Sequence, residues 1–154
     1  MIPRDFITEW RAHAPWTQDL QVEQDLVISR ALVELFSKPA LVESLAFRGG
    51  TALYKLHIRP AARYSEDIDL VQTRPEPIGA TLDAIREALD PWLGTPQRKV
   101  KAGSAAVLYR FSSEDAPLCR FASRSRSTPE STSLSSHSDA PLSRSRHAGL
   151  AGKR

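Results

Sequence analysis

Residues 47–70 read FRGGTALYKLHIRPAARYSEDIDL, and this stretch decides the fold. Two adjacent glycines, Gly49 and Gly50, come directly before a short amphipathic run. Asp67 and Asp69 lie near the end of the stretch and are separated by one apolar residue. A glycine turn followed at short range by paired carboxylates predicts a strand, a turn, a helix and a second strand, which together make a small α/β unit.

The Asp-x-Asp pair is predicted to lie on a strand. Side chains two residues apart in a strand point to the same face, so Asp67 and Asp69 would share one face while Ile68 faces the core. Two carboxylates at such close range are tolerated when solvated or when a divalent cation lies between them. Mg²⁺ prefers oxygen ligands from one or two carboxylates, completed by water and phosphate. The pair is therefore a candidate metal site.

The glycines supply a candidate phosphate site. A Gly-Gly turn before a helix lets backbone N–H groups approach a phosphate at the positive helix end, and Thr51 adds a hydroxyl there. Lys55 and Arg63 lie between the two halves and could neutralise phosphate charge, with the forked guanidinium of arginine suited to bidentate contact. Together these parts predict a site for a nucleoside triphosphate and its metal.

Each of these features also has a purely structural interpretation. A Gly-Gly pair before a helix is often only a turn, and Asp-x-Asp is often a solvated strand edge or a helix cap. Arg63 could simply pair with Glu66 or Asp67. The functional hypothesis depends on the order and spacing of the parts.

The flanking sequence predicts an α+β domain. Apolar residues at helical spacing predict a helix from Thr17 to about Ser37, with Thr17 as N-cap and a short helix before it that ends near Pro15. A short strand is expected at 46–48, helical turns at 51–56, a strand at 68–71, a helix at 78–89 stopped by Pro91, and a hairpin of 98–101 with 105–111.

The composition fits one modest soluble domain. The chain has 154 residues, of which 41% are hydrophobic and 25% are charged, as in ordinary globular proteins. No apolar run reaches the roughly 18 residues of a membrane span, which predicts a cytoplasmic protein without membrane contact. The single cysteine, Cys119, can form neither an internal disulfide nor a multi-cysteine metal site.

The net charge of +3 arises from the C-terminal segment. Residues 1–119 contain 14 basic and 16 acidic residues, whereas residues 120–154 contain 7 basic and 2 acidic ones. The segment also holds ten serines and four large apolar residues, too few for a packed core. We expect an N-terminal arm at 1–16, a partial core at 17–118 and a disordered Ser/Arg-rich tail at 119–154.

The combined pattern Gly49-Gly50-Thr51-x-Leu53 with Arg63-x-Ser65-x-Asp67-x-Asp69 resembles the AbiEii/AbiGii-type toxin nucleotidyltransferases. The similarity extends over about residues 17–115. It implies a polymerase-beta-like nucleotidyltransferase core, a mixed sheet packed by helices, that is incomplete here. Asp67 and Asp69 would hold Mg²⁺ or Mn²⁺, the Gly-Gly-Thr region would hold the triphosphate, and Ser65 would contact phosphate or support the site.

The same resemblance implies an activity and partners. Members of the family transfer a nucleoside monophosphate from a nucleoside triphosphate to an acceptor, tRNA for some of them. They are the toxin half of toxin–antitoxin and phage-defence systems, which implies a cognate antitoxin.

The sequence departs from the family after Phe111. The resemblance implies a strand of the type Leu-Lys-Ile-Glu-Ile that supplies a third carboxylate, and the Ser/Arg-rich segment stands in its place. Codons can be chosen for residues 120–133 that give PLRLKIEINTREHF when they are translated one base earlier. We therefore interpret the segment from about Cys119 as a frameshifted terminus and expect impaired catalysis, with the strand at 105–111 left as an unpaired edge.

Two other functions stay open at this point. The basic segment could bind nucleic acid, in which case binding would be salt-sensitive and lost on removal of residues 120–154. Alternatively, the chain could be an inactive fragment that keeps only interaction surfaces.

Overall fold

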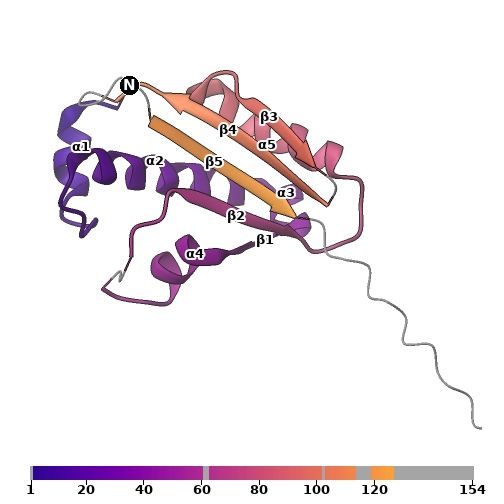
Figure 1. Cartoon of the computed structure of the whole chain (residues 1–154), viewed down its shortest axis with the longest axis horizontal. Coiled ribbons are helices and arrows are strands. Elements are labelled where there is room, and N and C mark those ends of the chain that lie inside the picture. The colour runs from indigo at the N-terminus through magenta and orange to yellow at the C-terminus, as the bar shows by residue number, and fades with distance from the viewer. Residues whose placement is uncertain (1, 61–62, 102, 114–118, 127–154) are drawn as a thin grey trace, which may run out of the picture.

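The computed structural model describes residues 2–60, 63–101, 103–113 and 119–126 (Figure 1). Five helices and five strands are found there. In chain order they are α1 (Arg4–Trp10), α2 (Asp19–Phe36), α3 (Pro39–Ser44), β1 (Leu45–Arg48), α4 (Gly49–Leu56), β2 (Asp67–Gln72), α5 (Ile78–Leu93), β3 (Gln97–Lys101), β4 (Ser104–Phe111) and β5 (Cys119–Arg126).

The strands form one mixed sheet in the order β1-β2-β5-β4-β3. β2 is antiparallel to β1 and parallel to β5, while β4 is antiparallel to both β5 and β3. The last strand of the described chain therefore lies at the centre of the sheet. This arrangement confirms the expected α+β class with a mixed sheet packed by helices.

The hydrophobic core lies between one face of the sheet and the long helices. Fully buried side chains of α2 and α5 pack against Ile68 and Leu70 of β2 and against Val107 and Tyr109 of β4. Figure 1 shows α2 and α5 behind the sheet, with no helix drawn across its front face. Because side chains alternate along a strand, the residues between these buried ones face the front.

Most of the expected local elements are confirmed. The first helix was expected to end near Pro15 but ends at Trp10, and two details of the longer helices also differ. Thr17 does not cap the long helix, because α2 begins at Asp19 with Gln18 as N-cap and no side-chain cap bond. Pro91 does not stop α5, which continues to Leu93. Proline in the last turn removes only one helical hydrogen bond, and the burial of Leu93 holds that turn on the core.

The expectation for residues 119–126 was wrong. They form β5, which pairs with β2 on one side and with β4 on the other, so β4 is not an unpaired edge. Hydrogen bonds to the two neighbouring strands can satisfy the backbone N–H and C=O groups on both edges of β5. The expectation was based on apolar composition, which does not report this backbone pairing. The expected tail from 127 to 154 lies outside the described residues.

Candidate functional site

The two carboxylates of the Asp-x-Asp pair share one face of the sheet. Along β2 exposure alternates, with Ile68 and Leu70 buried and Asp67 and Asp69 partly exposed. The aspartates are therefore on the front face, opposite the helices. Both carboxylates are partly exposed on this face, and the intervening isoleucine anchors the strand in the core.

Gly49 passes directly over Asp69. β1 pairs with β2 so that Arg48 lies opposite Asp69, and α4 begins at the next residue. Gly49 has a φ of +83°, and a Cβ added there would lie 2.5 Å from Oδ2 of Asp69. Only glycine fits both this backbone conformation and this close approach. The pairing of β1 with β2 thus brings the glycine turn and the carboxylates into one place.

Thr51 ties the glycine turn to the aspartate strand. Its side chain is buried, and Oγ1 lies within hydrogen-bond distance of the Asp67 carbonyl oxygen and, at 2.8 Å, of Ser65 Oγ. A carbonyl can only accept, so the Thr51 hydroxyl donates to Asp67 and accepts from Ser65. The Thr51 hydroxyl, expected at a phosphate, is thus engaged within the protein.

A cavity of about 320 Å³ lies beside the turn and includes three of the expected phosphate-binding residues, Gly50, Arg63 and Ser65. Its remaining lining residues are Leu53, Tyr54 and Ile58. Arg63 is exposed, and none of the ion pairs between described residues involves it. The described ion pairs thus give no support to the alternative in which Arg63 pairs with Glu66, and Arg63 lines this cavity.

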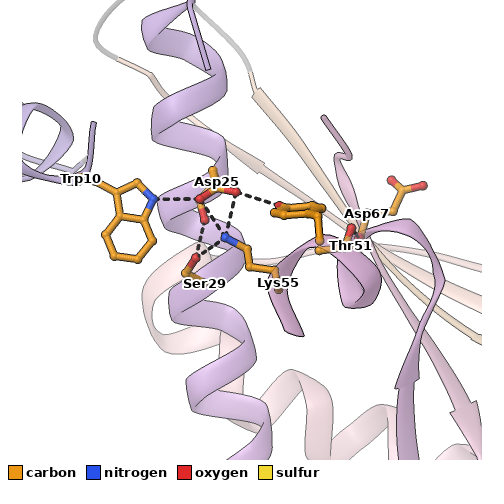
Figure 2. Close-up of polar contacts among 7 residues, drawn as sticks. Trp10, Asp25, Ser29, Thr51, Lys55 and Asp67 are labelled. Atoms are coloured by element: carbon orange, nitrogen blue, oxygen red, sulfur yellow. Dashed lines mark hydrogen bonds and ion pairs between the residues drawn. The ribbon is translucent and has the colours of Figure 1, made fainter. Parts of the chain in front are cut away.

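Lys55 was expected to contact phosphate, but its side chain is bound to a carboxylate of the protein. Its Nζ lies 2.8 and 2.7 Å from the two carboxylate oxygens of Asp25 and 2.7 Å from Ser29 Oγ. Figure 2 shows this lysine directed at α2, with Thr51 and Asp67 on the other side of α4. The ammonium group is held by a buried carboxylate and joins α4 to α2.

Asp25 is the centre of a buried network that the sequence analysis missed. Its carboxylate also accepts hydrogen bonds from Trp10 Nε1 at 2.8 Å and from the Tyr54 hydroxyl at 2.7 Å (Figure 2). Burial lowers the pKa of Lys55, whereas burial followed by the nearby Asp25 charge raises the pKa of Tyr54. One signal in the sequence could have indicated this burial. Asp25 lies three residues from both Val22 and Ile28, and therefore on the apolar face of the predicted helix.

This network forms one wall of a second cavity of about 560 Å³, which is also lined by residues 11–15 and 58–60. Tyr54 and Ile58 line both cavities, so the two adjoin along α4. The cavity beside the glycine turn is the smaller of this pair.

The metal expected at Asp67 and Asp69 has two suitable ligands. Hard carboxylate oxygens on one strand face, beside a glycine that leaves space for them, suit a magnesium-type ion. Within residues 2–113 and 119–126, as far as described, no three His, Cys, Asp or Glu side chains gather as a metal site. The residues of β5 in register with 67–69 are Ala122, Ser123 and Arg124, none of which is acidic.

The sheet is mixed, and the Gly-Gly turn between β1 and α4 lies against the strand that carries Asp67 and Asp69. These features define the nucleotidyltransferase class of fold. The sequence profile of the family described as "Nucleotidyl transferase AbiEii toxin, Type IV TA system" matches residues 30–127. The match spans more than half of the chain, and the chain belongs to this family.

Solved structures agree with this assignment at the level of the fold. JHP933 from Helicobacter pylori is 16% identical, with a TM-score of 0.52 over 74% of this chain and 47% of its own. MenT4, a nucleotidyltransferase toxin from Mycobacterium tuberculosis H37Rv, is 18% identical, with a TM-score of 0.50 over 84% of this chain and 44% of its own. The chain therefore spans about half the length of these structures. No curated protein sequence matches it.

No helix among the described residues is long and apolar enough to cross a membrane.

Proposed function

We propose that this chain derives from a metal-dependent nucleotidyltransferase that moves a nucleoside monophosphate from a nucleoside triphosphate to an acceptor. The observation that carries the proposal is the close approach of Gly49 to Asp69, because it brings the turn that we propose to bind phosphate beside the paired carboxylates. Asp67 and Asp69 would hold Mg²⁺ or Mn²⁺. When bound, the metal would orient the triphosphate and neutralise charge at the reacting phosphorus.

The chain's own residues would bind and orient the nucleotide. Gly50 offers its backbone at the start of α4, and Arg63 and Ser65 line the same cavity. In the reaction the acceptor hydroxyl oxygen bonds to the α-phosphorus, the bond to the bridging oxygen breaks, pyrophosphate leaves and the hydroxyl proton passes to a base. By analogy with the family, tRNA is a candidate acceptor and a cognate antitoxin a candidate partner, in a toxin–antitoxin or phage-defence system.

We infer that transfer by this chain is impaired. The central strand β5 contains no acidic residue that could serve as the third carboxylate, and such a group would help to bind metal or act as the general base. Restoring the alternative reading frame from about Cys119 should then raise transfer. If the coding DNA does not continue as a folded domain in that frame, the frameshift hypothesis is wrong.

The direct test is binding of a fluorescent nucleoside triphosphate analogue with and without Mg²⁺. Asp67→Asn and Asp69→Asn should each abolish the metal-dependent part of the binding. Asp83→Asn is the matched control, because Asp83 is exposed on α5. Unchanged binding in both site variants, or no metal-dependent binding by the unaltered chain, would overturn the proposal.

A further inference from the structure

The larger of the two cavities, about 560 Å³ in volume, lies between two loops. Residues 11–15 follow α1 and form one rim, and residues 58–60 follow α4 and form the other. This volume is within the roughly 300–1,000 Å³ of small-molecule sites. Figure 2 shows Asp25 and Lys55, which line the cavity, on the α2 side of α4 and away from Asp67. The cavity is therefore separate from the candidate metal site.

The polar groups on the floor of this cavity are used within the protein. The Asp25 carboxylate accepts one hydrogen bond from Trp10, one from Tyr54 and two from Lys55. The third Lys55 donor is directed to Ser29 Oγ. A carboxylate has about four acceptor positions and an ammonium group has three donors, so both charges are fully engaged. Three helices are thereby fixed around the cavity, and Asp25 is not left to bind a metal.

The rims of the cavity are cationic. Arg11 and His13 lie on one rim and Arg59 on the other, and all three are exposed. Among the described residues that line the cavity, Asp25 is the only acidic one. Arg11 pairs with Asp19, whereas none of the ion pairs between described residues involves Arg59. The charge at the mouth therefore favours an anion, and a guanidinium suits phosphate or carboxylate.

The interior of the cavity offers aromatic and apolar surface. Lys55 Nζ lies 5.7 Å from the centroid of the Trp10 ring and 5.2 Å from that of the Tyr54 ring, so both rings border the same part of the floor. The remaining lining side chains are apolar, namely Ala12, Ala14, Pro15, Ile58 and Pro60. Such a lining suits a flat ring, which packs against aromatic faces.

We propose that this cavity binds a small organic anion that carries a flat aromatic ring, with the ring beside Trp10 and the charged group at Arg59. A mononucleotide and an aromatic carboxylate share this chemistry. Binding requires no metal, because the Asp25 carboxylate is engaged. The site does not depend on the proposed function, although its ligand would contact α4, whose first turn holds Gly49.

The test titrates the full ¹⁵N-labelled chain with AMP or indole-3-acetate in the presence of EDTA and follows the indole N–H resonances of its three tryptophans by NMR. Trp10→Phe assigns the Trp10 resonance. At least one of the two anions should shift this resonance saturably and leave that of Trp92, which does not line the cavity, unchanged. The tighter ligand assigns the site to mononucleotides or to aromatic carboxylates. No shift with either anion, or equal shifts at Trp10 and Trp92, would overturn the proposal.

Two uncomplexed parts of the ligand test whether both features are read. Adenosine carries the ring without the charge, and inorganic phosphate carries the charge without the ring. Each should bind at least roughly tenfold more weakly than the preferred anion, because each leaves one half of the site unfilled. Equal binding of inorganic phosphate would reduce the cavity to a general anion site and reject the proposal.

Variants locate the ligand. Arg59→Gln should weaken binding roughly tenfold, since it removes a charged partner. Arg74→Gln is the matched control, because Arg74 is exposed and lines neither cavity. Ala12→Phe fills the mouth from an exposed position and should abolish binding without changing thermal unfolding. Undiminished affinity in both cavity variants, or a loss found only in Arg63→Gln, would overturn the proposal, the latter because Arg63 lines the smaller cavity.

The metal dependence separates this site from the proposed function. Asp67→Asn should leave metal-free binding of the anion unchanged, and Arg59→Gln should leave Mg²⁺-dependent binding of the triphosphate analogue unchanged. If the Trp10 resonance responds to the anion but the chain binds no nucleotide with Mg²⁺, the proposed function fails and the cavity site stands. If nucleotide binds with Mg²⁺ but neither anion shifts the Trp10 resonance, the cavity site fails alone.

Discussion

Gly49 and Asp69 meet so closely that no side chain can stand between them: a Cβ on residue 49 would lie 2.5 Å from Oδ2 of Asp69. The contact follows from the pairing of β1 with β2, which sets Arg48 opposite Asp69. The glycine is thus needed for the position of the aspartate as well as for the turn.

Gly49→Ala should destabilise the protein and disturb the carboxylates. A non-glycine residue at positive φ costs roughly 1–2 kcal/mol, and the added methyl must displace Asp69. Gly50→Ala is the matched control for stability alone, since its Cβ would lie 3.7 Å from Ser65 Oγ in ordinary contact. Urea unfolding and Mg²⁺-dependent nucleotide binding measure the two effects. Equal stability of the two variants would contradict the interpretation.

Asp25→Asn should lower the free energy of unfolding by about 2–4 kcal/mol, because it leaves the Lys55 ammonium without its buried carboxylate. Lys55→Met should also destabilise, and the double variant should lose less than the sum of the single losses. Glu34→Gln, which breaks the exposed pair with Arg30, should cost about 0.5 kcal/mol or less. Strictly additive losses for Asp25 and Lys55 in urea unfolding would argue against a coupled pair.

Thr51→Val should cost about 1–3 kcal/mol, because it removes a buried donor from the Asp67 carbonyl oxygen. It should also weaken Mg²⁺-dependent nucleotide binding, because the hydrogen bond from Thr51 of α4 to β2 positions Asp67. Ser65→Ala, which removes only the donor to Thr51 at a partly exposed position, should destabilise less. Chemical denaturation ranks the two variants, and the reverse order would exclude the proposed direction of the hydrogen bonds.

Stability should fall as the pH rises above about 10. Burial and the hydrogen bond to Asp90 raise the pKa of Tyr109 above its ordinary 10.0, so the folded protein keeps a proton that the unfolded chain releases. Burial raises the pKa of Tyr54 as well. The lowered pKa of Lys55 acts in the opposite sense, because below 10.5 the unfolded chain binds more protons at this group.

Tyr109→Phe separates these contributions. It should be less stable at neutral pH, where the hydrogen bond to Asp90 is lost, but its stability should decline less steeply between pH 10 and 11.5. Unfolding free energies measured across this interval provide the comparison. Parallel curves for the variant and the unaltered protein would show that Tyr109 does not contribute to alkaline destabilisation.

The expected elements were largely correct because their signals are local. Apolar spacing located α2 and α5, and the glycines located the start of α4 after β1. The errors occurred where tertiary context outweighs local preference. Pro91 lies within a turn that the buried Leu93 holds on the core, and β5 is held by strands on both sides. The boundary expected at residue 119 failed for this reason.

The predictions for the candidate site were likewise correct where the signal is local and wrong where a distant segment decides. The sequence identified Gly49, Gly50, Asp67 and Asp69 by type and spacing, and the turn and strand they were expected to form are present. It could not tell that Lys55 is directed to Asp25, because the spacing of one helix does not specify its partner helix. Nor could it tell that the Thr51 hydroxyl is used within the protein.

The sequence by itself determined the order of the elements, the alternation along β2 and the need for glycine at a turn, because dihedral preference and hydrophobic period act over a few residues. Only the tertiary structure decided that Gly49 lies over Asp69 and that Asp25 holds Lys55. These relations depend on strand order and register, which contacts between distant segments select together.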